Sequence, residues 1–177
     1  MDQKDPRNLI DKYKGLENEA IIADLDKTRI PLEIAIENLS HDFNIGTIVR
    51  NANAFNVSKL HIIGKKKYNR RGAMVTDKYL HIYHHADISD FVTSQKNRTL
   101  IAIENNTPAA RPLSSAKFPA QTTLIFGSES DGISPELLAE ARHTYFIEQL
   151  GSTRSINVGC ASAVAMYIYC RDKGLLG

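Results

Sequence analysis

Beyond residue 30, the chain alternates short apolar runs with segments of helical pattern, and this alternation constrains the fold more than any other feature. The runs are rich in Ile, Leu and Val, as expected of strands that are buried on both faces. Strand candidates are residues 32–38, 59–64, 81–85, 99–105, 122–127 and 144–148. Helix candidates are residues 45–55, 87–96, 134–141 and 156–172. This order of elements predicts an α/β fold with a mostly parallel sheet and helices on both faces.

The length of 177 residues fits one domain with a short appendage. Residues 1–30 are polar and place their apolar side chains mostly three or four positions apart. This pattern predicts an N-terminal helical arm that is interrupted at Gly15. Residues 31–177 then form the folded domain, in which the Pro-containing stretch 105–120 is interpreted as a long exposed connection.

Composition excludes several classes of protein. Hydrophobic residues make up 42% of the chain and charged residues 24%. No apolar run approaches the roughly 18 residues of a membrane span. The N-terminus has no apolar segment of the secretory type, so we expect a cytoplasmic protein that does not enter a membrane.

The two cysteines, Cys160 and Cys170, fall in one predicted helix, where they would lie about 15 Å apart. That distance excludes a disulfide between them. No Cys or His cluster has the spacing of metal ligands, so we expect no metal site. Both thiols are interpreted as small buried side chains.

Residues 59–85 are strongly basic, although the net charge of the whole chain is only +2. This segment holds seven Lys and Arg against one acidic residue, together with four histidines and three tyrosines. Basic and aromatic side chains that alternate are typical of surfaces that contact phosphates and unstacked bases. The alternative is a solvated loop, because single basic runs are common. The predicted RNA-binding residues are Lys65, Lys66, Lys67, Arg70 and Arg71.

Three polar or glycine-rich stretches follow predicted strands: SHDFNIGTIVRNANAF, FGSESDGISPE and EQLGSTRSINVGCA. In parallel sheets, binding sites gather where loops leave the carboxyl ends of strands. The second stretch lacks GxGxxG and the Lys-Ser/Thr of a phosphate-binding loop, so a dinucleotide or nucleoside triphosphate is poorly supported. Within it, Glu129 either serves the site or caps the helix that begins near Ser134.

The third stretch leads into a helix with a face of small residues. For Gly159 and Ala163, tight helix packing is the simplest interpretation. Ser155 and Asn157 are different, because a helix start with two polar side chains suits a polar ligand or a phosphate.

Taken together, three patterns in this order resemble the motifs of SpoU-type RNA ribose 2′-O-methyltransferases: NxGxxxRNA from Asn44, FGxExxGI from Phe126 and LGxxxSINV from Leu150. The resemblance covers roughly residues 31–173. It implies a SPOUT-superfamily domain with a C-terminal trefoil knot, which acts as a homodimer and binds S-adenosylmethionine in the knot. Close backbone approach in such a knot would explain Gly127, Gly132 and Gly151.

The resemblance also implies roles for individual residues. Catalytic or substrate-organising positions are matched by Asn44, Arg50, Glu129, Ser155 and Asn157. Cofactor-binding positions are matched by Ile103, Glu104, Gly127, Ile147, Leu150 and Ile156. The chain departs from the family in INVGCA, where the third motif more often has LNVSVA.

Methyl transfer to a ribose requires a weakly acidic 2′-hydroxyl to become a nucleophile, so positioning and charge should do most of the work. We expect Arg50, held by Asn44 or Glu129 and fixed by Asn51, to stabilise the developing alkoxide. A general base is the less favoured role, because a guanidinium is normally always charged. We expect Gly46 to admit the substrate or a partner chain.

The main expectation is therefore methylation of a ribose in tRNA or rRNA. A homodimer that binds RNA but has lost catalysis is the alternative from another class. Methylation of a base is the alternative chemistry.

Overall fold

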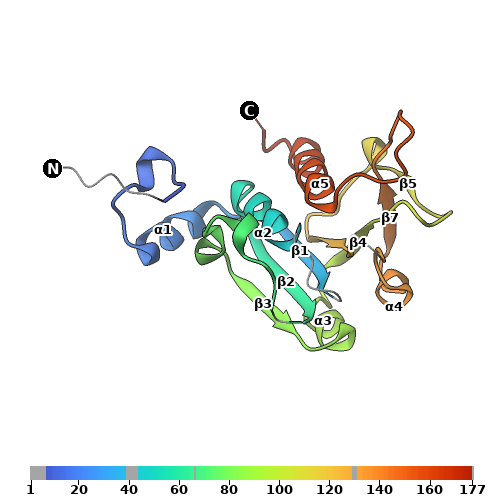
Figure 1. The fold of residues 1–177 in the computed structure, drawn as a ribbon, viewed down its shortest axis with the longest axis horizontal. Coiled ribbons are helices and arrows are strands. Elements are labelled where there is room, and N and C mark those ends of the chain that lie inside the picture. Colours follow the sequence, from blue (N-terminus) through green and yellow to red (C-terminus); the bar gives the residue numbers. More distant parts are fainter. Residues whose placement is uncertain (1–6, 39–43, 66, 129–130, 177) are drawn as a thin grey trace.

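The computed structural model describes residues 7–38, 44–65, 67–128 and 131–176, and Figure 1 shows their arrangement. Glu129 and Lys66, two of the predicted site residues, lie outside these ranges.

A seven-stranded sheet with the order β3-β2-β1-β6-β4-β7-β5 forms the centre of the molecule. All pairings between its strands are parallel. The strands are β1 (Ile30–Asn38), β2 (Val57–Gly64), β3 (Ile82–His85), β4 (Thr99–Ile103), β5 (Arg111–Pro112), β6 (Thr122–Phe126) and β7 (His143–Phe146). The predicted α/β class and all six predicted strands are thereby confirmed.

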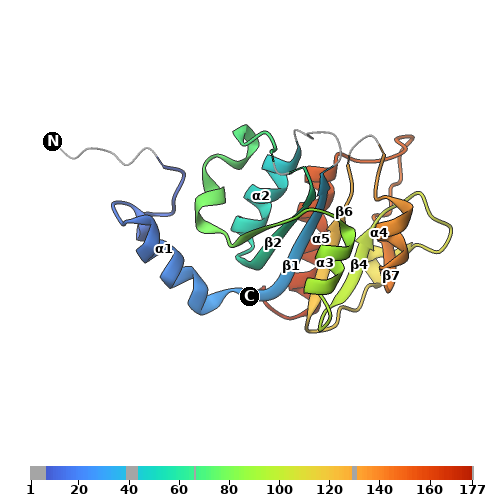
Figure 2. The ribbon, with the colours of Figure 1, turned by 90° about the horizontal axis from the view of Figure 1, so that it is seen from below.

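Helices cover both faces of this sheet, with α2 and α5 on one side and α3 and α4 on the other (Figures 1 and 2). These helices are α2 (Asn44–Ala54), α3 (Ile88–Ser94), α4 (Pro135–Ala139) and α5 (Val158–Asp172), and the arm contains a fifth helix, α1 (Asn18–Leu25). Apart from α1, each begins and ends within two residues of a predicted helix.

The central strands divide their side chains between two cores. Ile34 and Ile36 of β1 belong to the larger core, which also contains residues of α2 and α5. Ala35 between them belongs to the smaller core, together with Phe91 of α3 and Leu137 of α4. This period-two alternation explains why the strands have nearly continuous apolar sequences: each face meets a helical layer.

The stretch 105–120 is more structured than predicted. It contains β5, which pairs with β7, and a 3-10 turn, Leu113–Ser115. Leu113, Ala116 and Phe118 are buried in the larger core. The prediction of a long exposed connection is therefore wrong at these three residues and holds for most of the others. The strand was missed because a two-residue edge strand that contains a proline has no period-two pattern.

The N-terminal arm is less helical than predicted. Over residues 7–30, helical structure is limited to α1 and to 3-10 turns at Asp11–Tyr13 and Asp26–Thr28. Gly15 breaks the pattern with φ +76°, as predicted. Arg29 anchors the end of the arm by donating hydrogen bonds to the carbonyl oxygens of Val57 (3.3 Å) and Tyr79 (2.9 Å). Figure 2 shows the arm at the end of the molecule away from β7.

Both cysteines are free, as expected, but only Cys170 is buried. The prediction of a buried Cys160 is wrong, because this residue lies on the exposed side of α5, whereas its neighbour Gly159 is buried. Over the residues that the structure describes, no helix combines the length and apolar character needed to cross a membrane.

A chain of buried polar groups runs beneath α3. Glu33 on β1 accepts a hydrogen bond from Nε2 of His61 on β2 (2.9 Å), and Nδ1 of His61 lies 2.9 Å from Nε2 of His85 on β3. The Arg98 guanidinium lies 3.3 Å from the Glu33 carboxylate. His61 and His85 are 3% and 7% exposed, so these two histidines of the basic segment do not belong to its surface.

Burial alone would raise the pKa of Glu33, but the hydrogen bond from His61 and the charge of Arg98 outweigh it and lower this pKa to about 2. Burial lowers the pKa of His61, although Glu33 opposes that shift. Both lowered pKa values favour a neutral imidazole that donates to an ionised carboxylate.

Candidate active site

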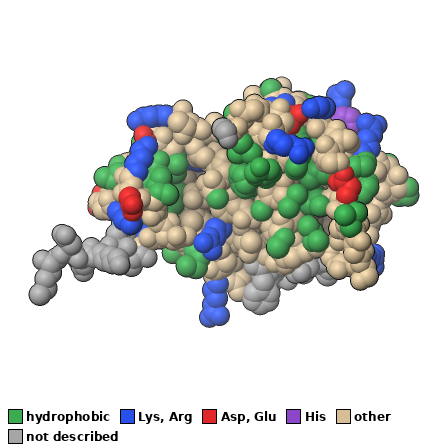
Figure 3. Space-filling model, turned by 90° about the horizontal axis from the view of Figure 1, so that it is seen from above, with side chains coloured by type: hydrophobic (Ala, Val, Ile, Leu, Met, Phe, Trp, Pro, Cys, Tyr) green, Lys and Arg blue, Asp and Glu red, His purple; other side chains and the backbone are tan. Residues whose placement is uncertain are grey.

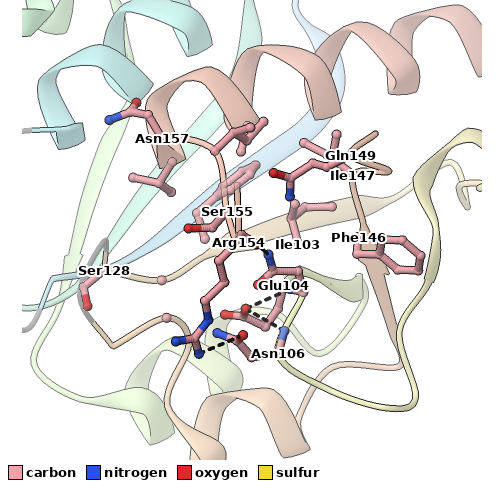
Figure 4. Close-up of a pocket in the computed structure, with 17 residues that line it drawn as sticks. Ile103, Glu104, Asn106, Ser128, Phe146, Ile147, Gln149, Arg154, Ser155 and Asn157 are labelled. Carbon is pink, nitrogen blue, oxygen red and sulfur yellow. Dashed lines mark hydrogen bonds between the residues drawn. The ribbon is translucent and has the colours of Figure 1, made fainter. Parts of the chain in front are cut away.

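A cavity of about 270 Å³ lies at the carboxyl ends of β4, β6 and β7. The last residue of each strand, Ile103, Phe126 and Phe146 respectively, lines it. The lining is completed by residues 104–106, Gly127, Ser128, Gly132, Ile147, Gln149, 154–158 and Ala161 (Figure 4). This is the position expected for a ligand site in an open parallel sheet.

The floor of the cavity depends on two glycines. A Cβ on Gly127 would lie 2.0 Å from the carbonyl carbon of Gly132, because the turn after β6 folds back against the end of the strand. Gly132 has φ +70°, and a Cβ there would lie 2.5 Å from Oε2 of Glu104. Close approach is thus confirmed at both positions. The prediction of close approach is wrong for Gly151, where a Cβ would meet nothing within 4 Å.

Glu104 joins the loop after β4 to this turn. Its Oε1 accepts hydrogen bonds from the backbone N–H groups of Asn105 (2.8 Å) and Asn106 (3.1 Å). Its Oε2 accepts one from the N–H of Ile133 (3.1 Å). The carboxylate therefore organises one wall of the cavity from within.

A second pair of contacts holds the opposite walls together. The side-chain amide of Asn105 donates to the carbonyl oxygen of Arg154 (2.8 Å), and Nη2 of Arg154 donates to Oδ1 of Asn106 (3.3 Å; Figure 4). The motifs do not include these three residues. Their position directly after β4 was the signal that could have identified the two asparagines.

The first and third motifs meet through two asparagines. Asn157 caps α5 by accepting a hydrogen bond from the N–H of Cys160 (3.2 Å), and its Nδ2 donates to Oδ1 of Asn44 (2.7 Å). The start of α2 is thereby tied to the edge of the cavity. Ser155 and Asn157 both line the cavity, whereas Asn44 is not among the lining residues and contacts Asn157.

Helices α2 and α5 pack closely next to this contact. Asn51 donates hydrogen bonds to the carbonyl oxygen of Gly159 (2.8 Å) and to Oγ of Ser162 (2.9 Å). A Cβ on Gly159 would lie 2.8 Å from Cγ2 of Thr47. Tight packing is therefore confirmed for Gly159.

Arg50 does not line this cavity. Its side chain is exposed and makes no hydrogen bond or ion pair with any described residue. It lies at a separate hollow, which is also lined by residues 8–10 of the arm and by Asn53, Ala54 and Thr76. The expectation that Asn44 or Asn51 holds Arg50 is wrong, because both asparagines turn toward α5.

Gly46 also has a different role from the one expected. A Cβ there would lie 2.8 Å from the carbonyl oxygen of Asn69 and 2.9 Å from the backbone nitrogen of Ala73. It therefore admits a loop of its own chain.

Five of the six predicted cofactor-binding residues lie together in the cavity: Ile103, Glu104, Gly127, Ile147 and Ile156. The sixth, Leu150, is fully exposed and is not among the lining residues. Sequence alone did not distinguish Leu150 from its neighbours, because adjacent side chains of a loop can point in opposite directions.

The basic loop, residues 65–71, begins at the end of β2. Lys65, Lys67, Arg70 and Arg71 are exposed. The Asn38 side-chain amide donates to the carbonyl oxygens of Lys65 and Lys67 and fixes the base of the loop. The guanidinium of Arg70 lies 5.9 Å from the ring centre of Tyr68 and 3.7 Å from the carboxylate of Asp77.

Hydrophobic side chains are exposed on the face that carries α5 (Figure 3). Val164 and Tyr167 of α5 are 38% and 52% exposed, and Leu175 and Leu176 follow that helix. Among the described residues, no group of three or more His, Cys, Asp or Glu side chains is suited to hold a metal ion.

Comparison with known proteins gives a family match and a set of similar proteins. The model of the SpoU rRNA Methylase family matches residues 31–167. A tRNA (guanosine(18)-2′-O)-methyltransferase of Escherichia coli is 25% identical over 146 residues, which cover 80% of this chain and 64% of that protein. The chain thus spans less than two thirds of this relative.

Two solved structures share the fold. The TrmH/SpoU tRNA modifying enzyme of A. aeolicus superimposes with a TM-score of 0.77 at 22% identity, covering 89% of this chain and 83% of that one. The AdoMet-bound rRNA methyltransferase of Sinorhizobium meliloti gives a TM-score of 0.74 at 21% identity, covering 86% and 61% respectively.

Proposed function

The chain belongs to the SpoU rRNA methylase family, and from this premise we propose that it methylates the 2′-hydroxyl of a ribose in tRNA or rRNA, with S-adenosylmethionine as methyl donor. The observation that carries the proposal is the cavity in which residues of the second and third motifs meet at three strand ends. The names of the relatives give no support to an inactive RNA-binding dimer.

The cavity fits the proposed cofactor in size and chemistry. Its volume of about 270 Å³ is close to the lower end of the range for small-molecule sites, roughly 300 to 1,000 Å³. Apolar side chains, including Ile103, Ile147 and Ile156, suit a flat base, and Glu104 and Arg154 add polar groups. When bound, S-adenosylmethionine would supply a methyl group on a positively charged sulfur.

The chain itself must hold the ribose in line with that methyl group and stabilise the negative charge that develops on the 2′-oxygen. Ser155 and Asn157 are suited to orient the ribose, because both face the cavity from the start of α5. Asn44 would act through its hydrogen bond to Asn157. Glu129 stays a proposed substrate-organising residue outside the described ranges.

We assign charge stabilisation to Arg50, acting at the cavity of a second copy of the chain. Its exposed guanidinium lies outside its own cavity, so a homodimer would complete the site. The exposed apolar side chains of α5 offer a surface for such a dimer. Light scattering at micromolar concentration should give twice the mass of the chain, and an active monomer would refute this assignment.

The remaining parts have supporting roles in the proposal. The basic loop, with Lys66 included, would bind RNA phosphates, and the arm, residues 1–30, would be an appendage of the methyltransferase domain, residues 31–177. The close approach at Gly127 and Gly132 is compatible with the trefoil knot expected of the family. An enzyme that modifies tRNA or rRNA would act in the cytoplasm.

Mapping of 2′-O-methylated riboses in RNA from cells with and without the protein tests the proposal directly. A ribose that loses its methyl group in the deletion strain, and regains it with the purified protein and S-adenosylmethionine, is the expected result. An unchanged methylation map, together with no transfer to bulk tRNA or rRNA, would refute the proposed function.

A further inference from the structure

Gln149 lines the cavity, and its side chain has no hydrogen-bonding partner among the described residues. It follows β7, and Figure 4 shows its side-chain amide directed toward the interior of the cavity near Ile103. Its Oε1 is shielded from solvent and accepts no hydrogen bond from any described residue. A shielded amide oxygen without a donor is unfavourable for the folded protein.

The surroundings of this amide are apolar. The neighbouring lining residues of its own segment are Phe146 and Ile147, and Ile103 lies across from them (Figure 4). The charged groups of the cavity have other partners: Glu104 accepts a hydrogen bond from the N–H of Ile133, and Arg154 donates one to Asn106. The cavity therefore has an apolar region with one unpaired amide, which suits a flat ring with polar atoms on one edge.

A glutamine amide presents a donor and an acceptor side by side. This pair matches the edge of adenine that carries the 6-amino group and the ring nitrogen N7. The last torsion of a glutamine side chain is soft, so either end of the amide can turn toward the ligand. A ribose hydroxyl or a carboxylate would need only one of these two groups.

We propose that Gln149 recognises the base of the cofactor's nucleoside, accepting a hydrogen bond from its 6-amino group and donating one to the ring nitrogen N7. This inference rests on the proposed use of S-adenosylmethionine and adds a residue that selects adenine over other purines. Replacement of the 6-amino group by an oxo group should then present two acceptors, the oxo group and N7, to an amide that has one donor, so one acceptor stays unmatched whichever way the amide turns.

The test is a binding measurement that does not depend on turnover. S-adenosylhomocysteine and S-inosylhomocysteine, which carries the oxo group, are titrated into the full-length protein by calorimetry. We expect the wild type to prefer the adenosyl compound by about tenfold or more, the effect of one unmatched buried hydrogen bond. Gln149→Met, which keeps the length of the side chain, should reduce this preference to less than about threefold.

Two controls separate recognition from a structural role. Gln149→Met should not lower the melting temperature, because it removes an unsatisfied buried group. The same substitution at exposed Gln121, which precedes β6, should leave the preference intact.

Each result decides the question. Equal binding of the two compounds by the wild type, or an unchanged preference in Gln149→Met, would overturn the inference and leave the proposed function standing. If the wild type binds neither compound, the cofactor proposal and the inference both fail.

Discussion

Arg50 is the residue on which the proposed chemistry depends most. Lysine keeps the positive charge but loses the planar fork of the guanidinium, so both Arg50→Ala and Arg50→Lys should lose most turnover. Loss of one aimed charge-stabilising group typically costs about 2.7 to 4 kcal/mol, or 10² to 10³ in rate. Single-turnover methyl transfer at saturating RNA measures this loss separately from binding.

Cofactor affinity should be unchanged in both Arg50 variants, because this side chain lies outside the cavity. If Arg50→Ala kept more than about a tenth of the wild-type rate, the loss would be under about 1.4 kcal/mol, and Arg50 would not be catalytic.

Gly132 and Gly151 form a matched pair for a test of the cavity floor. Gly132→Ala puts a Cβ 2.5 Å from Glu104 and forces a left-handed backbone on alanine, which should cost about 2 kcal/mol or more. It should also weaken cofactor binding, because Glu104 lines the cavity. Gly151→Ala has open space and should be neutral. Urea unfolding measures the stability of the two variants, and calorimetry measures their affinity for the cofactor. Equal results for the two variants would show that this account of the cavity floor is wrong.

Single residues show where sequence reasoning succeeds and where it stops. The motif positions Gly127, Ser155 and Asn157 do lie at one cavity, because the ends of parallel strands meet at one edge of a sheet. Gln149 and Leu150 are adjacent in sequence, yet one lines the cavity and the other is exposed. Only the backbone conformation of the loop separates them.

At the scale of elements, the basic loop is the proposed RNA-binding surface. Its base is fixed by Asn38, while its four described cations extend into solvent. If they contact phosphates, replacement of Lys65, Lys67, Arg70 and Arg71 by alanine should weaken binding to bulk tRNA and reduce its salt dependence. Each lost contact should lower the log–log slope by roughly 0.7 to 0.9.

Lys96→Ala is a control for the loop variant, because this exposed lysine follows α3 on the opposite face of the sheet. Binding of S-adenosylhomocysteine should be equal in all variants. A slope that does not change in the loop variant would identify the loop as merely solvated.

Elements with a strong period were predictable, and elements without one were not. The apolar side chains of α2 recur with the period of a helix, and those of β1 with the period of a strand. The bounds of both elements therefore follow from sequence within about two residues. β5 is too short to show any period, and the sequence pattern of the arm extends well beyond the eight residues that are helical in α1. Both depend on contacts with distant segments, which sequence pattern does not reveal.

At the scale of the whole molecule, the two faces of the sheet have different tasks. The face with α2 and α5 adjoins the cavity through the contact between Asn44 and Asn157. The face with α3 encloses the polar chain of Glu33, His61 and His85, none of which lines the cavity. Disruption of this polar chain should therefore alter stability without altering cofactor specificity.

Acid should destabilise the protein through this polar chain. The pKa of His61 is lowered on folding, so the stability that its neutral form gives is present above its ordinary pKa of 6.5 and is lost as the pH falls below it. The pKa of Glu33 falls from 4.5 to about 2, so its contribution is present above pH 4.5 and is lost toward pH 2. Stability should thus decline from about pH 6.5 downward.

Glu33→Gln tests the larger part of this effect. A pKa lowered from 4.5 to about 2 corresponds to a contribution on the order of 3 kcal/mol near neutral pH. The variant should therefore unfold at lower urea concentration at pH 7, because Arg98 and His61 lose an ionised partner. Between pH 5 and pH 3 its stability should fall less steeply than that of the wild type, since it has no carboxylate to protonate at this position. Urea titrations at pH 7, 5, 4 and 3 give both slopes, and parallel decline of the two proteins would show that Glu33 does not control the acid response.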